Sequence, residues 1–167
     1  MQIAVQLDRT AAVPPEVIYT WDADTEILSA HMRGSHAGYG VSGSLGVEGR
    51  DGSWLILDLQ GGRINAVEVA VWPDVHRRQD LQPPDAVEDA SVSLRTDGGA
   101  QGVAAVEVQT SVVAALNPVD RVYHFRLGPR RQSRTVRLAR DILLDIDRDS
   151  RLAGLWLLNV PPCPTPA

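Results

Sequence analysis

The fold is decided by a stretch near the C-terminus, Ile142-Leu143-Leu144-Asp145-Ile146-Asp147-Arg148-Asp149-Ser150-Arg151-Leu152-Ala153-Gly154-Leu155-Trp156-Leu157. Two apolar runs flank a short polar turn there, which is the pattern of a β-hairpin. An earlier stretch follows the same order, Leu55-Ile56-Leu57-Asp58-Leu59-Gln60-Gly61-Gly62-Arg63-Ile64-Asn65-Ala66-Val67-Glu68-Val69. In both stretches a strand that carries Leu-Asp precedes a tight turn and a strand that opens with Arg. The chain therefore contains an internal repeat.

The repeat extends upstream of each hairpin. An Asx-rich turn and an alternating strand occupy residues 21–32 in the first copy and 116–127 in the second, and the copies end at Pro73 and Pro161. Residues 73–89, which lie between the copies, have the proline and charge content of a linker and place a boundary near residue 84. The two predicted domains are residues 1–83 and residues 84–167, the second with a proline-rich tail.

Alternation along each predicted strand separates a core face from an opposite face, because side chains two residues apart share a side. The predicted core positions are Leu28, Ala30, Met32, Leu57, Leu59, Val67, Val69, Tyr123, Phe125, Leu127, Leu144, Ile146, Leu155 and Leu157. The best helix candidate, residues 103–115, is rich in valine, so we expect one short helix at most. We expect an all-β fold in which two antiparallel β-meander repeats pack with pseudo-twofold symmetry as a sandwich or a flattened barrel.

Composition narrows the classes of partner. The 167 residues include 44% hydrophobic residues without a run long enough to span a membrane, so we expect a soluble protein with no membrane partner. The net charge of −5 makes nucleic acid an unlikely partner. Cys163 is the single cysteine, which excludes an intramolecular disulfide and favours the cytoplasm.

The second half resembles a short bacterial domain that is known only as domain of unknown function 2283. That family's pattern is an Asp-rich turn, then Leu-Tyr-Ile-x-Leu, and later Asp-x-Asp-x-x-Gly-Arg-Leu-Val-Gly-Ile-Glu-Ile-Leu. Asp120, residues 122–127 and residues 145–158 follow that order over about fifty residues. The first half is a looser match, because Gln60-Gly61-Gly62-Arg63 shortens the acidic turn by one residue and residues 33–51 lengthen the middle excursion.

The resemblance implies a small antiparallel β fold and carries no catalytic residues. Some single-copy relatives look like partners of toxin-like proteins, which implies a binding role. The tandem form differs from them in size, and it could reproduce a dimer of single-copy relatives.

Three acidic residues alternate at Asp145, Asp147 and Asp149, as oxygen ligands do in calcium-binding loops. However, Trp156 stands at the loop position where a bidentate Glu belongs, and Arg148 places a positive charge inside the site. We therefore interpret the segment as a solvated hairpin turn and predict no metal and no cofactor.

Six arginines gather between residues 126 and 140, which is enough charge to bind phosphate or an acidic protein surface. They do not fall on one strand face, and aromatic residues that would stack on bases are missing. We favour a solvated excursion and an edge strand protected by charge. The six arginines are Arg126, Arg130, Arg131, Arg134, Arg137 and Arg140.

The face opposite the predicted core holds the candidate binding surface. Ser29, His31 and nearby carboxylates suggest a Ser-His-Asp relay, but alternation cannot establish the contacts that a relay needs. Cross-strand polar pairs are the simpler interpretation. The candidate residues are His31, Asp58, Glu68, His124, Arg126, Asp145 and Trp156.

Trp72 and Trp156 also align to that opposite face, where a large aromatic residue must be covered or used for recognition. We favour packing between the two halves over an external ligand. The tail, residues 161–166, favours an extended polyproline conformation and is expected to be a surface strap or a disordered end.

The preferred function is a noncatalytic binding or regulatory module that recognises a protein partner. One alternative is a small enzyme or ligand carrier, with a cleft between the repeats lined by His31, Asp58, Glu68 and His124. Another is a structural protein that adds a strand at an exposed sheet edge. A homo-oligomer stays open as well.

Overall fold

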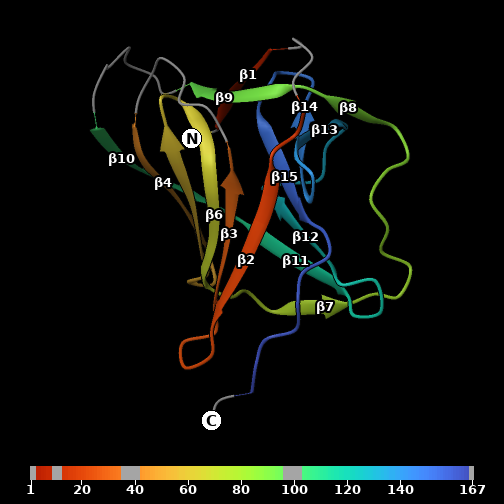
Figure 1. The fold of residues 1–167 in the computed structure, drawn as a ribbon. Coiled ribbons are helices and arrows are strands. Elements are labelled where there is room, and N and C mark those ends of the chain that lie inside the picture. Colours follow the sequence, from red (N-terminus) through yellow and green to blue (C-terminus); the bar gives the residue numbers. More distant parts are fainter. Residues whose placement is uncertain (1–2, 9–12, 35–41, 96–102, 166–167) are drawn as a thin grey trace.

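The computed structural model describes residues 3–8, 13–34, 42–95 and 103–165, and these form an all-β fold of two packed sheets (Figure 1). Sheet A contains eight strands. They are β1 (Ala4–Asp8), β2 (Glu16–Asp22), β3 (Ile27–Arg33), β4 (Ser42–Gly49), β5 (Trp54–Gln60), β6 (Arg63–Val71), β9 (Ser91–Arg95) and β10 (Val103–Thr110). Sheet B contains seven strands. They are β7 (Val75–Arg77), β8 (Val87–Asp89), β11 (Val112–Asn117), β12 (Val122–Leu127), β13 (Ser133–Ala139), β14 (Ile142–Asp147) and β15 (Leu152–Leu157).

The internal repeat is visible in the order of the strands. Neighbours in sheet A run β2-β3-β6-β5-β4-β10, and neighbours in sheet B run β11-β12-β15-β14-β13-β8. The two hairpins also share an irregular register. The pairing of β5 with β6 shifts after Asp58, and the pairing of β14 with β15 shifts after Asp145. The repeat predicted from the Leu-Asp hairpins is therefore matched by equivalent registers in three dimensions.

Two parts of the predicted fold need correction. Each repeat is not a simple meander, because the last strand of the β4-β5-β6 or β13-β14-β15 meander returns beside β3 or β12, as in a Greek key. The sheets are also mixed, since β10 with β4, β7 with β11 and β8 with β13 are parallel pairs. The sheets pack as a sandwich, so the flattened barrel does not form.

The predicted boundary near residue 84 does not separate the sheets. The short strand β7 belongs by sequence to the first half but pairs in sheet B, whereas β9 and β10 follow the boundary and pair in sheet A. Only Ser111 separates β10 from β11, so the chain crosses there from one sheet to the other. Residues 103–115, the helix candidate, are strand apart from Ser111, and the described residues contain no helix. Among them, no helix could therefore cross a membrane.

The exchange between the sheets is reciprocal where β1 and β9 pair. Val5 on β1 donates its backbone N–H to Ser150 before β15, and Leu94 on β9 donates to Gly62 before β6. Val5 and Leu94 are themselves partners in the antiparallel β1–β9 pair. A twofold axis near this pair relates the two contacts, which is the symmetry that the repeat predicted.

One hydrophobic core lies between the sheets. The predicted core positions are buried there, apart from Tyr123, which is half-buried against the core. Burying each large apolar side chain contributes about 1.5–3 kcal/mol, so this shared layer holds the sheets together. It also directs the alternate residues of every strand to two outer faces on opposite sides of the molecule.

Candidate functional site

The registers equate individual residues on the two outer faces. In β3 and β12, Ser29 corresponds to His124, since each is paired with an equivalent position of the neighbouring strand. The other equivalent pairs are Asp58 with Asp145, Ala66 with Gly154, and Glu68 with Trp156. The same backbone positions therefore carry different side chains on the outer face of sheet A and the outer face of sheet B.

The predicted single surface is divided by this geometry. Three candidates lie on the outer face of sheet A, namely His31, Asp58 and Glu68. The other four, His124, Arg126, Asp145 and Trp156, lie on the outer face of sheet B. Because the shared core separates the sheets, these residues do not line one cleft between the repeats, and the predicted cleft is wrong.

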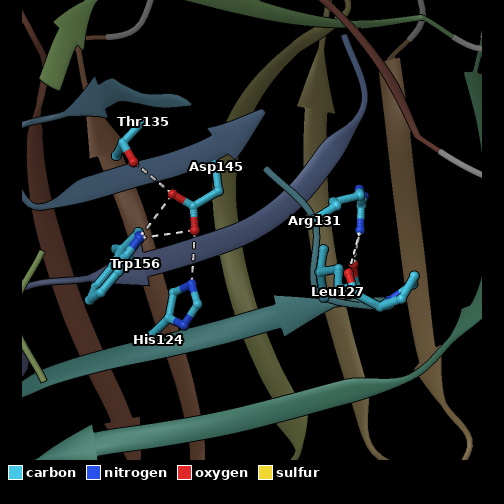
Figure 2. Close-up of polar contacts among 7 residues, drawn as sticks. His124, Leu127, Arg131, Thr135, Asp145 and Trp156 are labelled. Atoms are coloured by element: carbon cyan, nitrogen blue, oxygen red, sulfur yellow. Dashed lines mark hydrogen bonds and ion pairs between the residues drawn. The ribbon is translucent and has the colours of Figure 1, made fainter. Parts of the chain in front are cut away.

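Asp145 is the centre of a polar cluster on the outer face of sheet B (Figure 2). Its carboxylate is paired with His124 Nε2 at 2.8 Å and accepts a hydrogen bond from Thr135 Oγ1 at 2.8 Å. Trp156 Nε1 lies 3.1 Å from each carboxylate oxygen. The four side chains come from four adjacent strands, β12, β15, β14 and β13, so the cluster ties the middle of sheet B together.

Gly154 makes this cluster possible. The imidazole of His124 lies against the Trp156 indole, with 4.2 Å between ring centroids. Both His124 and Asp145 reach over Gly154: a Cβ there would lie 2.7 Å from Asp145 Oδ2 and 3.0 Å from His124 Nε2. A side chain at this position would push the pair apart, which explains a glycine inside a strand.

The environment of Asp145 favours its ionised form. Burial by itself would raise the pKa of the carboxyl, but the hydrogen bonds from His124, Thr135 and Trp156 and the positive charge available on His124 hold the pKa below its ordinary value. Within the described residues, no hydroxyl or thiol is hydrogen-bonded to His124. The cluster thus lacks the nucleophile of a Ser-His-Asp relay and serves as a network of cross-strand pairs.

Trp156 is covered by the segment between β7 and β8. Leu81 from this segment packs with Trp156, Leu143 and Val122 in a second, small apolar cluster. Asn117, which is buried, donates to the carbonyl oxygens of Gln79 and Leu81. The predicted linker is therefore a strap, residues 78–86, which runs along the outside of sheet B (Figure 1).

The tryptophans behave differently from one another. Trp156 contacts the first half, as predicted, but it does so through Leu81 of the strap, which covers it on the outer face of sheet B. Trp72 packs against the shared core, where it stacks on Trp21 at 5.6 Å and lies 5.2 Å from Tyr123 of the second half. It therefore joins the halves, although not on the outer face where alternation placed it.

The outer face of sheet A is open in the described part of the chain. Trp54 and Ile56 on β5 are half-buried there, and the Trp54 ring lies over Gly46 of β4. Ile18 on β2 is 45% exposed. Four carboxylates lie on the same face, on β5 and on the strands to either side of it, those of Glu48, Asp58, Glu68 and Glu107. Alternation along β5 already places Trp54 and Ile56 on the same face as Asp58, although neither was among the predicted site residues.

Most arginines of the stretch 126–140 form contacts with other residues of the protein. Arg131 donates to Asp147 at 2.7 Å and to the backbone oxygens of Leu127 and Leu152, so it fastens the crossing between β12 and β13. Figure 2 shows its contact with Leu127. Arg134, Arg137 and Arg140 lie 3.6–3.7 Å from carboxylates on other segments. Arg126 differs, because its buried Nε has no hydrogen-bond partner among the described residues.

The three alternating carboxylates do not converge. Asp145 is held by the cluster on the outer face of sheet B, and Asp147 accepts from Arg131 and from the backbone N–H groups of Asp149 and Arg151. Burial would raise the pKa of Asp147, but these donors lower it. Asp149 is exposed. Asp147 thus builds the turn, and the described residues contain no group of acids, histidines and cysteines that could hold a metal.

The start of the predicted tail is fixed to β2. The Tyr19 hydroxyl donates to the backbone oxygen of Leu158 at 2.8 Å, and Trp21 Nε1 donates to that of Pro161 at 2.7 Å. This contact mirrors β7, which follows β6 and pairs with β11, the equivalent of β2. The tail therefore begins as a surface strap.

Comparison of the chain with models of known protein families and with curated proteins finds no match, so the resemblance to domain of unknown function 2283 stays a prediction.

Proposed function

We propose that this protein is a noncatalytic binding module that holds an extended, basic segment of a partner protein on the outer face of sheet A. The observation that carries this proposal is the difference in covering between equivalent positions. Leu143 and Trp156 on sheet B are 0% and 6% exposed beneath the strap, whereas their equivalents Ile56 and Glu68 remain partly open.

The strap shows what kind of occupant such a face accepts. Residues 78–86 form no strand, and they cover sheet B by placing one apolar side chain, Leu81, among outer-face residues. The outer face of sheet A offers Ile56 at the position equivalent to Leu143, with Trp54 two residues away on the same face of β5. A partner segment with one or two apolar anchors would fit it in the same way.

The negative charge of this face favours a partner segment that carries positive charge. Glu48, Asp58, Glu68 and Glu107 give the face four carboxylates, and within the described ranges none of them forms an ion pair with an arginine. Glu48 is instead bonded to Gln109, and Glu68 accepts a hydrogen bond from Ser29. A segment rich in Arg or Lys would find these carboxylates available, which favours fast association and the exclusion of acidic segments.

The enzyme alternative has less support. Its predicted residues lie on opposite faces, and the partly buried Asp145–His124 pair is bonded to Thr135 and Trp156 across neighbouring strands. We place the protein in the cytoplasm, as the single exposed cysteine suggests.

Photocrosslinking at defined positions tests the proposal. An apolar photoreactive residue replaces Ile56, and matched controls replace Val119, which is 76% exposed on the β11–β12 turn, and Gln109 on β10. In an extract of the source cells, we expect position 56 to crosslink to a basic segment of one protein. Equal capture at position 119, an acidic captured segment, or crosslinks confined to position 109 would contradict it, the last by indicating strand addition to β10.

A further inference from the structure

We infer that the hollow beside the β14–β15 turn is a binding site for a phosphate group, on inorganic phosphate or on a small phosphate ester. The hollow has a volume of about 450 Å³ and lies between the start of β13 and the turn. It is lined by Gln132, Ser133, Arg134, Ile146, Asp147, Arg148 and Ser150. This site is on sheet B and does not depend on the binding proposed for sheet A.

The lining is rich in hydrogen-bond donors whose capacity is unused. Within the described residues, the side chains of Arg148, Ser133 and Ser150 have no hydrogen-bond partner. Arg134 lies 3.7 Å from Glu88, which is too far for a hydrogen bond, so its guanidinium can still donate. Guanidinium groups together with hydroxyls form the donor set that phosphate oxygens prefer.

Asp147 is the only carboxylate among the described residues that line the hollow, and it does not oppose an anion. One oxygen of Asp147 is paired with Arg131 at 2.7 Å, and the other accepts from two backbone N–H groups of the turn. The negative charge of Asp147 is thereby compensated by Arg131 and by the turn backbone, and its side chain is only 6% exposed. Among the described residues that line the hollow, Arg148 forms no ion pair, and Arg134 shares its charge with Glu88 at 3.7 Å.

The same contacts fix the hollow before a ligand arrives. Asp147 holds the backbone of the turn, and Ser150 adopts a left-handed conformation with φ of 58°. Because the backbone of the turn is held in advance, less conformational entropy is lost when a ligand binds. The equivalent hairpin of sheet A has Gly43 and Gln60 where this one has Arg134 and Asp147, and its turn is shorter, so the donors are not a requirement of the fold.

Calorimetric titration of the full chain with inorganic phosphate, glycerol phosphate and uncharged glycerol tests this site. We expect saturable binding of the phosphates at about millimolar concentration or below, and none of glycerol. Tighter binding of glycerol phosphate would identify an ester as the ligand, and equal binding would identify phosphate itself. Arg148→Ala and Arg134→Ala should each weaken binding about tenfold, the effect of losing one charged hydrogen bond.

Arg130→Ala is the matched control, because Arg130 is exposed, belongs to the same arginine stretch and does not line the hollow. It should change phosphate affinity less than about twofold. An equal loss in Arg130→Ala and Arg148→Ala would show that general positive charge attracts the anion, and no saturable binding by the wild type would also overturn the site. Neither result would alter crosslinking at position 56.

Discussion

The outer faces of the two sheets share a backbone and differ in what covers them. On sheet B, the strap covers Trp156, and the Asp145 carboxylate accepts hydrogen bonds from neighbouring side chains. On sheet A, the equivalent Glu68 and Asp58 face outward, and Asp58 is exposed. The outer face of sheet B is therefore covered by another segment of the same chain. The equivalent face of sheet A has no such cover among the described residues.

A single position shows how the faces diverge. Gly154 leaves room for the His124–Asp145 contact, whereas Ala66 occupies the corresponding place beside Ser29 and Asp58. The outer face of sheet A has no equivalent of the His124–Asp145 contact among the described residues, so Ala66 fits at that position. Stability should therefore depend strongly on the outer face of sheet B and weakly on that of sheet A.

The largest contrast is expected at the position of Trp156. Trp156→Ala removes the indole from the cluster beneath Leu81 and should lower the free energy of unfolding by about 3–5 kcal/mol. Glu68→Ala, at the equivalent position, should change it by less than about 0.5 kcal/mol. Urea unfolding followed by circular dichroism measures both, and similar losses would break the comparison.

Asp145→Asn should cost about 1.5–3 kcal/mol at neutral pH, because it removes charged hydrogen bonds in a buried site. The folded-state pKa of Asp145 is depressed, so its contribution is present above the unfolded pKa of about 3.9 and is lost as pH falls through the folded pKa. The gap between wild type and variant should therefore close below about pH 4. Unfolding midpoints between neutral and acid pH test this, with Asp58→Asn as the control.

Gly154→Ala is expected to cost about 1–3 kcal/mol, since the new methyl group overlaps the His124–Asp145 pair. The reverse exchange on sheet A, Ala66→Gly, should cost only about 0.5–1 kcal/mol, through backbone entropy. Nuclear magnetic resonance of the imidazole should show His124 displaced in the first variant. An unchanged imidazole signal with full stability would show that the glycine is not needed for the pair.

The smallest effect on stability is expected for Ile56→Arg, less than about 0.5 kcal/mol, because the side chain is only half-buried on an open face. The same variant should abolish capture of the basic segment, by removing an apolar anchor and adding a like charge. Val119→Arg should leave capture intact. Retained capture in Ile56→Arg would place the partner elsewhere.

Much of the fold could be predicted, because local patterns carry it. The Leu-Asp hairpins revealed the repeat, and alternation found the core, since both depend on residues close in sequence. The exchange of β7, β9 and β10 between sheets could not be predicted, because alternation gives a strand its faces but not its neighbours.

The site was harder to predict than the fold. Alternation placed Asp145 and His124 on one face correctly, but it could not show that the core separates them from His31. Leu81 stands alone in a proline-rich and charged segment, so its role as the anchor of the strap has no local signature. Asp147 seemed to be a solvated turn residue, yet its contact with Arg131 requires the crossing between β12 and β13.

Thiol accessibility at two equivalent positions tests the central claim most directly. In a Cys163→Ser background, Ile56→Cys and Leu143→Cys place one thiol on each outer face, at positions that are half-buried and 0% exposed, respectively. We predict that the thiol at position 56 is alkylated readily in the folded protein, whereas the thiol at position 143 reacts only at the rate of unfolding. Equal rates in the folded protein would contradict the account, because they would show that the strap does not close sheet B or that sheet A is not open.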